Sequence, residues 1–176
     1  MNIHTDMGDP PGITVPDKRG KTVEVCLFHP ADRGPLLRFY EDFQPKNDAQ
    51  GLPPSHPIRI RQWINSILAG GLHLIARRDG ELIGHAFVVP TDEPGIGEYA
   101  IFLREDTRGF GVGTALNRIA VDAARDMGWQ GLWLTVEPKN RSAVRSYENA
   151  GFRFVRKTVF WRDAEMRLDL QQQTKT

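Results

Sequence analysis

Hydrophobic positions in the first part of the chain alternate between strand-like and helical spacing. The run over 22–28 (TVEVCLF) is rich in β-branched residues and predicts a first strand, in which Cys26 is interpreted as core filler. Apolar residues recur at helical spacing over 30–43 and over 58–68, so each segment is expected to form a helix. The intervening segment 44–57 holds four prolines and a glycine, which predicts a loop long enough to have a functional role.

A hairpin follows. Two strand-like runs, 72–78 and 81–90, are separated by Asp79-Gly80, a dipeptide that favours a type I′ turn. His73 and His85 lie on these runs and are interpreted as packed or surface side chains. Neither has a carboxylate or a second histidine at a sequence spacing that suits metal binding or a catalytic triad.

The remaining pattern predicts a strand, a helix, a strand, a short helix and a closing hairpin. These segments cover 97–103, 112–127, 131–136, 140–150, and the pair 152–161 with 164–170. The run GLWLTV is almost continuously apolar, which is typical of a strand buried on both faces. Strands and helices in this order indicate a mixed α/β domain built on one central sheet.

Length and charge narrow the picture further. A chain of 176 residues suits one domain, expected over 22–170, with a flexible tail over 1–21 and a polar tail over 171–176. The 23 basic and 22 acidic side chains leave a net charge of +1, which argues against a nucleic-acid binder. One cysteine excludes an internal disulfide and CxxC metal spacing, and no metal site is expected. Without an apolar leader or membrane-length segment, the expected location is the cytoplasm.

A glycine-rich turn, RGFGVG over 108–113, falls between a predicted strand and a predicted helix. The N-terminus of a helix leaves backbone N–H groups without intrahelical partners and carries roughly half a positive charge. Glycines lack Cβ and let a phosphate approach these N–H groups closely, while Arg108 and Thr114 add side-chain donors. The turn therefore predicts a cradle for a pyrophosphate.

Other glycine motifs fit this turn less well. A Rossmann fingerprint needs GxGxxG and an acidic residue about 20 positions later, and a P-loop needs GK[ST]; neither pattern is present here. An RNA-recognition octapeptide matches over 108–111, but Val112, Thr114 and Ala115 stand where stacking aromatics are needed. A glycine-rich turn that binds no ligand stays open as an alternative.

Three segments together resemble the GNAT superfamily of acetyl-CoA-dependent N-acetyltransferases. They are the strand GEYAIFL, the turn RGFGVG and the segment NRSAVRSYENAGF, within a resemblance that spans about 22–170. The resemblance implies one α/β domain with a mixed, mostly antiparallel sheet, about four flanking helices, and two strands that splay apart to receive acetyl-CoA as cosubstrate. The cofactor-binding residues that it implies are Ile101, Phe102, Leu103, Arg108, Gly109, Phe110, Gly111, Val112, Gly113, Thr114 and Asn140.

The same resemblance implies direct transfer of the acetyl group to an amine. Tyr147 stands at the family's general-acid position, where its phenol can protonate the leaving thiolate, and the N–H near Leu103 is expected to polarise the thioester carbonyl. A lysine-type amine has a pKa near 10.4, so a base helps, with Glu98 as first candidate and Glu137 as second. Thr135 departs from the ribosomal-protein N-terminal acetylating branch, which usually has glutamate there.

Structural roles stay open for three of these residues: a packed tyrosine for Tyr147, a solvent-facing strand residue for Glu98 and a helix N-cap for Asn140. The acceptor site is expected beside the loop 44–57 and the turn 91–95. Acidic side chains that converge there would favour a cationic amine; they are Glu41, Asp42, Asp48, Asp92 and Glu93.

Two functions from different classes remain at this point. One is an active N-acetyltransferase whose acceptor is a small-molecule amine or a protein amine. The alternative is a catalytically weak acetyl-CoA sensor that regulates a partner. Neither nucleic acid nor a membrane is expected as a partner. Fold analogy leaves a homodimer open, with Phe160 and Trp161 on the closing hairpin as its surface.

Overall fold

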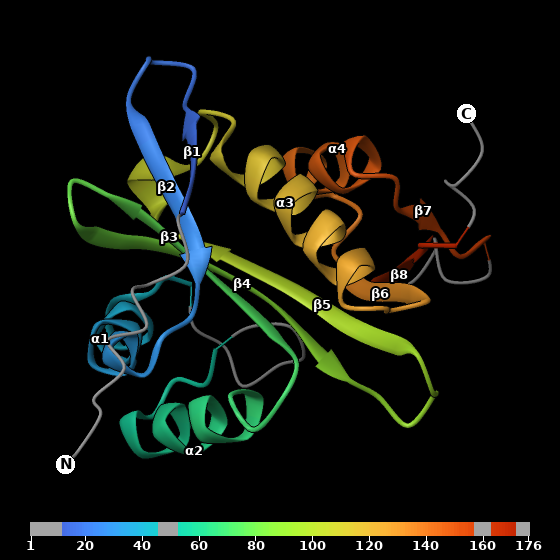
Figure 1. Ribbon diagram of the computed structural model, residues 1–176, viewed down its shortest axis with the longest axis horizontal. Coiled ribbons are helices and arrows are strands. Elements are labelled where there is room, and N and C mark those ends of the chain that lie inside the picture. The colour runs from blue at the N-terminus through green and yellow to red at the C-terminus, as the bar shows by residue number, and fades with distance from the viewer. Residues whose placement is uncertain (1–11, 46–52, 157–162, 172–176) are drawn as a thin grey trace, which may run out of the picture.

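An eight-stranded sheet forms the centre of the computed structural model, which describes residues 12–45, 53–156 and 163–171 (Figure 1). Its order is β1-β2-β3-β4-β5-β6-β8-β7, and neighbouring strands are antiparallel except β5 and β6, which are parallel. The strands are β1 (Ile13–Pro16), β2 (Thr22–Leu27), β3 (Leu72–Arg78), β4 (Glu81–Pro90), β5 (Ile96–Leu103), β6 (Gly131–Val136), β7 (Arg153–Phe154) and β8 (Ala164–Asp169). The α-helices are α1 (Arg33–Asp42), α2 (Pro57–Ile67), α3 (Val112–Asp126) and α4 (Arg141–Asn149).

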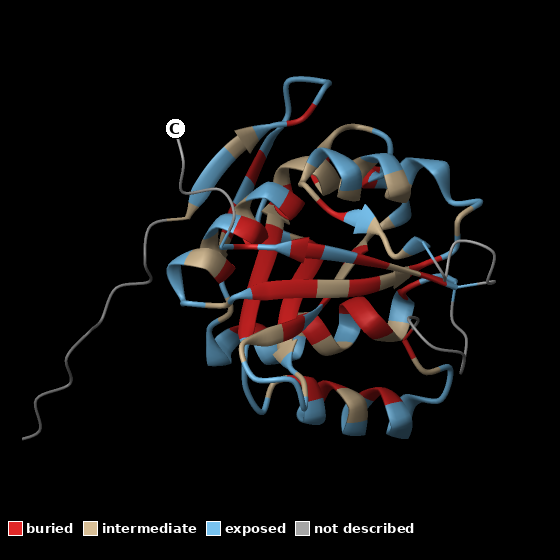
Figure 2. Cartoon of the chain, turned by 90° about the vertical axis from the view of Figure 1, so that its right-hand side faces the viewer, coloured by how far each residue is buried: buried red, intermediate tan, exposed pale blue. Residues whose placement is uncertain are grey.

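Two pairs of helices cover opposite faces of this sheet. Apolar side chains of α1 and α2 pack against one face, where Ile75, Phe87 and Phe102 complete a largely aromatic core. Side chains of α3 and α4 pack on the other face, around Leu116 and Phe152. Figure 2 shows the buried strands as a band between the two helical layers. The predicted fold class, a mixed and mostly antiparallel sheet with four helices, is therefore confirmed.

The fold begins before the predicted boundary near Thr22. Strand β1 pairs antiparallel with β2, with Ile13 opposite Val25 and Pro16 opposite Thr22. The β-branched residues of β1 suit an edge strand, and Pro16 ends it, where a missing N–H interrupts no central ladder. The expectation of a flexible tail is thus wrong for β1, and residues 1–11 lie outside the described chain.

Local signals place most element ends correctly. Asp79 and Gly80 both have positive φ, at 52° and 78°, as a type I′ turn requires. Gly128 has φ 86° just after α3, in the left-handed conformation that commonly ends a helix. The closing hairpin pairs two residues of β7 with β8. Its predicted surface residues Phe160 and Trp161 lie outside the described residues.

His73 and His85 are both buried, which confirms the prediction of packed side chains, and they hydrogen-bond each other across the β3–β4 hairpin. His73 Nε2 lies 3.2 Å from the Gly70 carbonyl, which can only accept, so this nitrogen carries the proton. His73 Nδ1 then accepts from His85 Nε2 at 3.1 Å, and His85 Nδ1 accepts from the Tyr40 hydroxyl at 2.7 Å. A buried hydrogen-bond chain therefore ties α1 to β3 and β4.

Burial keeps both histidines neutral. It lowers the pKa of His85 well below 6.5, and a charge on His73 would lower it further. Burial also lowers the pKa of His73, although the carbonyls of Gly70 and Ile67 partly oppose that change. A protonated His73 would have to donate from Nδ1 as well, which would reverse the hydrogen bonds toward Tyr40.

The free energy of unfolding should fall as the pH drops from 7 to 5. The unfolded chain binds protons on these histidines as the pH falls through about 6.5, whereas the folded chain does not. The free energy of unfolding therefore falls by up to about 1.4 kcal/mol per pH unit for each histidine that stays neutral in the folded chain. The double variant Tyr40→Phe/His85→Phe retains the ring packing and removes one titrating group, so its slope should be smaller. Urea unfolding at pH 7, 6 and 5 measures both, and equal wild-type stability at all three would contradict the assignment.

Candidate functional site

Strands β5 and β6 pair over only three residues and then part. Their parallel register joins Ile96 to Gly131 and ends where Glu98 meets Trp133, although β5 continues to Leu103 and β6 to Val136. Each strand keeps its other neighbour, because β5 pairs with β4 along its length and β6 with β8. The sheet therefore opens into a V whose apex lies at Glu98 and whose mouth lies toward Leu103.

Backbone groups of Ile101 and Leu103 face into this opening. The Arg104 N–H donates to the Ile83 carbonyl at 2.9 Å, which fixes the alternation of the antiparallel β4–β5 ladder. By that alternation, Phe102 turns its N–H and C=O toward β4, whereas Ile101 and Leu103 turn theirs toward β6. Backbone polar groups left without a strand partner need another one, and an extended ligand chain can supply it.

The glycine-rich turn closes the mouth of the V. Gly109 and Gly111 have φ of 80° and 87°, conformations that favour glycine, and Gly111 is the N-cap of α3. The first intrahelical hydrogen bond runs from the Ala115 N–H to the Gly111 carbonyl at 3.0 Å, so the preceding N–H groups point out of the helix. Gly113 lies so close to Leu103 that an added Cβ would stand 3.1 Å from Leu103 Cδ1.

Arg108 hydrogen-bonds two backbone carbonyls. Its Nε donates to the Leu103 carbonyl at 3.0 Å, and a terminal nitrogen donates to the Gln44 carbonyl at 2.8 Å. The guanidinium also lies 5.4 Å from the centre of the Phe43 ring. Arg108 thus joins the end of β5 to the segment after α1.

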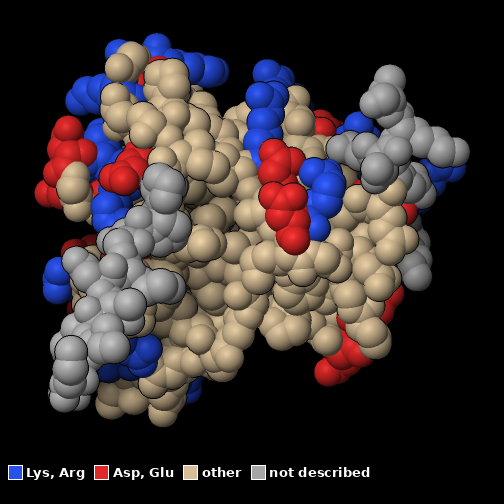
Figure 3. All heavy atoms as spheres, viewed as in Figure 1, with Lys and Arg blue, Asp and Glu red and all other residues tan. Residues whose placement is uncertain are grey.

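A cleft of about 980 Å³ fills the space between the two parted strands, α3 and α4. It is lined by ten residues of the predicted site: Ile101, Phe102, Leu103, Arg108, Gly109, Gly111, Gly113, Thr114, Asn140 and Tyr147. Phe110 and Val112 are not among its lining residues, since Val112 is buried in the core and the Phe110 ring lies under the Arg19 guanidinium. Figure 3 shows basic side chains gathered at the end of the molecule where the β1–β2 turn lies.

Tyr147 and Asn140 come to the cleft from α4. Burial raises the pKa of Tyr147 to about 12, so its phenol stays protonated and can act as a proton donor. Its ring packs edge-on against Tyr99 and Phe152. Asn140 caps α4 by accepting from the Ala143 N–H at 3.2 Å, so the N-cap alternative is correct, and the residue lines the cleft as well.

A polar network that the sequence did not reveal joins the two helical walls. The Tyr99 hydroxyl donates to Asn117 Oδ1 at 2.6 Å, and Asn117 Nδ2 donates to the Ser146 hydroxyl at 2.8 Å. Ser146 in turn lies 3.2 Å from the Thr114 hydroxyl. Asn117 and Ser146 both line the cleft. The signals in the sequence that could have indicated this are that Asn117 lies about one helical turn after Thr114 and that Ser146 directly precedes Tyr147.

The two candidate bases lie in different places. Glu137 follows β6 and lines the cleft. Glu98 stands at the apex of the V, on the β5 face that also carries Ala100 and Phe102, and burial raises the pKa of its carboxyl. Glu98 is nevertheless an exposed residue, as the alternative of a solvent-facing strand residue expects. Because Ala100 and Phe102 belong to the core under α1 and α2, Glu98 faces that side of the sheet, and it is not among the lining residues of the cleft.

The expected acidic acceptor site is not assembled within the described residues. Glu41 on α1 lies 3.9 Å from Arg61, and Glu93 in the β4–β5 turn lies 3.7 Å from Arg167. Neither they nor Asp42 or Asp92 line the cleft, and Asp48 lies outside the described part. Among the described residues no group of three or more metal-ligating side chains occurs, and no helix there has the length and apolarity of a membrane span.

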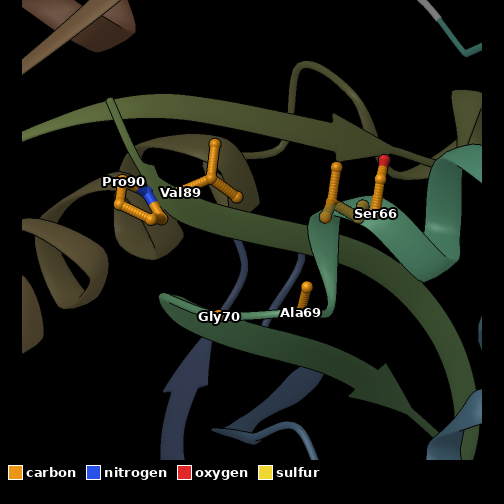
Figure 4. A pocket seen from close by; sticks show the side chains of 6 residues that line it. Ser66, Ala69, Gly70, Val89 and Pro90 are labelled. Atoms are coloured by element: carbon orange, nitrogen blue, oxygen red, sulfur yellow. The ribbon is translucent and has the colours of Figure 1, made fainter. Parts of the chain in front are cut away.

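A smaller hollow of about 340 Å³ lies where α2 ends beside β4 (Figure 4). Its only hydroxyl among the lining side chains belongs to Ser66, which donates to the Trp63 carbonyl at 2.8 Å. No titratable side chain lines it; the lining residues are Ser66, Ile67, Ala69, Gly70, Val89 and Pro90. The large cleft is therefore the candidate site.

A parted pair of parallel strands with a glycine-rich turn at its mouth defines an acyltransferase-type fold. Residues 36–152 match the model of the acetyltransferase (GNAT) family, and the chain belongs to that family. A mycothiol acetyltransferase of Thermomonospora curvata is 35% identical over 144 residues, covering 81% of this chain and 46% of that protein. The chain thus spans less than half of this relative's length.

Solved structures show the same fold at low sequence identity. The GNAT domain of S. lividans PAT has a TM-score of 0.73 at 20% identity, covering 90% of this chain and 96% of that one. A GNAT superfamily phosphinothricin acetyltransferase from Sinorhizobium meliloti, solved in complex with AcCoA, has a TM-score of 0.69 at 20% identity. That match covers 88% of this chain and 91% of the other. At such identity the likeness shows the fold alone.

Gly111→Glu should abolish most binding of acetyl-CoA, because a carboxylate would then stand where the helix N-terminus would meet phosphate. Gly128→Glu is the matched control: its φ of 86° is nearly that of Gly111, and an added Cβ has nothing within 4 Å. Both variants should lose about 1–2 kcal/mol of stability from left-handed strain. Calorimetric titration should show binding weakened at least about tenfold only in Gly111→Glu; equal binding in both variants would remove the turn from the site.

Proposed function

We propose that this chain is an N-acetyltransferase that moves the acetyl group of acetyl-CoA to a primary amine in a ternary complex. The observation that carries the proposal is the V between β5 and β6, with unpaired backbone groups on one wall and helix N–H groups at its mouth. Family membership supports it. The volume of the cleft, about 980 Å³, and its lining by both the glycine-rich turn and Tyr147 also support it.

Residues of both walls suit acetyl-CoA in particular. The N–H groups before Ala115, at the N-terminus of α3, would hold the pyrophosphate, while Ile101 and Leu103 would hydrogen-bond the pantetheine amides through their backbone. Asn140, already the N-cap of α4, would contact the same arm from the other wall. Because Arg108 holds the Leu103 carbonyl, the Leu103 N–H is the group left to polarise the thioester carbonyl.

Tyr147 would be the general acid. As the new C–N bond forms and the C–S bond breaks, the amine gives up a proton and the sulfur gains one, so no oxidant or reductant is involved. A phenol with a pKa of about 12 is protonated at neutral pH, so it has a proton to give to the sulfur as the C–S bond breaks. Tyr147 lines the cleft together with Ile101 and Leu103 of β5, which supports this role.

Glu98 would be the base that receives the amine proton. It stands at the apex, on the sheet face that α1 and α2 cover, so an acceptor that enters from this side meets the carboxylate first. Burial raises the pKa of Glu98 above 4.5 and thus brings it nearer to that of the amine. Glu137, on the cleft wall, is the second candidate for this role.

The acceptor belongs to the class of primary amines. One relative of this chain is named a mycothiol acetyltransferase, which supports a small-molecule amine over a protein amine. The aromatic core beneath α1 and α2, which reaches the cleft at Phe43 and Phe102, would form the floor of the acceptor site.

Replacing Tyr147 by Phe should lower turnover at least about tenfold while leaving the Kd for acetyl-CoA within about twofold, since only the proton donor is lost. Tyr99→Phe is the matched control. The Tyr99 ring packs edge-on against Tyr147, and its buried hydroxyl donates to Asn117. Removing this hydroxyl should lower the stability of the fold and leave turnover nearly unchanged, because Tyr147 keeps its own proton. Thiol release from acetyl-CoA with an amine acceptor measures turnover, and unchanged turnover in Tyr147→Phe would exclude it as the acid.

Glu98→Gln should lose most activity at low pH, where the acceptor amine is mostly protonated and a base is needed most. The ratio of wild-type to variant kcat/KM should therefore grow as the pH falls from 9 to 6.5. Glu137→Gln provides the comparison and should give a flat ratio. If the ratio is flat for Glu98→Gln and grows for Glu137→Gln, the two assignments are exchanged.

A further inference from the structure

The β1–β2 turn, residues 17–21, packs against the glycine-rich turn at the start of α3. The Lys18 N–H donates to the Phe110 carbonyl at 2.9 Å. The guanidinium of Arg19 lies over the Phe110 ring, with Cζ 3.6 Å from the ring centre. Two segments almost ninety residues apart in the sequence are thereby held in contact, one of them predicted as a tail and the other as the phosphate cradle.

Asp17 fixes the conformation of this turn. Its side chain is fully buried and accepts hydrogen bonds from the N–H groups of Arg19 at 2.8 Å and Lys21 at 2.9 Å. Arg78, on β3, donates to the same carboxylate at 2.8 Å, and the Arg19 guanidinium lies 3.2 Å away. Burial alone would raise the pKa of Asp17, but the hydrogen bonds from Lys21 and Arg19 and the charge of Arg19 lower it on balance, so the carboxylate stays charged. The turn is therefore a built part of the fold.

Lys18 is the residue that this turn directs to the cleft. Its side chain lines the cleft, and a Cβ built on Gly111 would lie 3.5 Å from Lys18 Cγ and 3.7 Å from Cε. The aliphatic stem thus runs over Gly111, which brings the ammonium group to the N-terminus of α3. An added Cβ at position 111 would meet this stem at ordinary van der Waals distance, so glycine is required here by its positive φ rather than by lack of space.

The neighbouring cations are already engaged. Arg19 and Arg78 bind Asp17, and Arg108 donates to the carbonyls of Leu103 and Gln44. Within the described residues, no carboxylate lies within ion-pair distance of Lys18. Its ammonium is therefore the charge at this turn that is available to a ligand, beside helix N–H groups that favour an anion.

We infer that Lys18 binds a phosphate oxygen of coenzyme A, so that β1 and its turn are part of the cofactor site. The inference rests on the proposed function. A lysine ammonium is a compact charge on a flexible stem and suits phosphate without demanding a fixed geometry. Both the pyrophosphate and the 3′-phosphate of coenzyme A offer this chemistry, and the experiment below separates them.

Calorimetric titration with acetyl-CoA should compare the wild type with Lys18→Met and with Lys21→Met, a control on the same turn that does not line the cleft. Lys18→Met should weaken binding about tenfold, whereas Lys21→Met should stay within about twofold. Lys18→Arg should retain most of the affinity because it keeps the charge. Urea unfolding should give the same stability for all four proteins, since Lys18 contributes its backbone, not its ammonium, to the turn.

Titration with 3′-dephospho-acetyl-CoA then identifies the phosphate. If the loss in Lys18→Met disappears with this ligand, Lys18 contacts the 3′-phosphate; if it persists, Lys18 contacts the pyrophosphate, and either result supports the inference. Binding of acetyl-CoA that is equal in wild type and Lys18→Met would overturn it while leaving the proposed function standing. A wild type that binds no acetyl-CoA would instead overturn the proposed function, and this inference with it.

Discussion

The parting of β5 and β6 after three residue pairs is the constraint on which the rest of the site depends. A parallel ladder that stops at Glu98 and Trp133 leaves Ile101 and Leu103 with backbone groups that face no strand. The strands cannot simply close, because each is held along its whole length by its other neighbour, β4 or β8. The close approach of Leu103 to Gly113 then sets α3 against the open end of the V.

Polar contacts keep the mouth of the V in shape. Arg108 anchors the end of β5 to the segment after α1, and the chain Tyr99–Asn117–Ser146–Thr114 ties α3 to α4 across the cleft. On the opposite face, α1 and α2 rest on an aromatic core stabilised by the Tyr40–His85–His73 hydrogen bonds. The α3–α4 side of the sheet is thus held by hydroxyl and amide groups, and the α1–α2 side by aromatic rings.

What the sequence predicted well has a local cause. Type I′ chemistry at Asp79-Gly80, the helical spacing of α3 and the Asn140 cap all depend on residues a few positions apart. What it missed depends on register or on distant contacts. His73 and His85 meet only because the β3–β4 ladder offsets them diagonally, and the hydrogen bond from Arg108 to the Gln44 carbonyl depends on a segment 64 residues earlier in the chain. The short edge strand β1 was hidden among prolines and glycines, and with it Lys18.

Amide hydrogen exchange, followed residue by residue with and without acetyl-CoA, tests most directly whether the parted strands hold the cofactor. If the cofactor occupies the V as an added strand, the amides of Ile101 and Leu103 and those at the start of α3 exchange more slowly in its presence. Ala100 and Phe102, whose amides already face β4, should be unaffected, which makes them internal controls. Acetyl-CoA that binds without protecting Ile101 or Leu103 would contradict the assignment of the cleft.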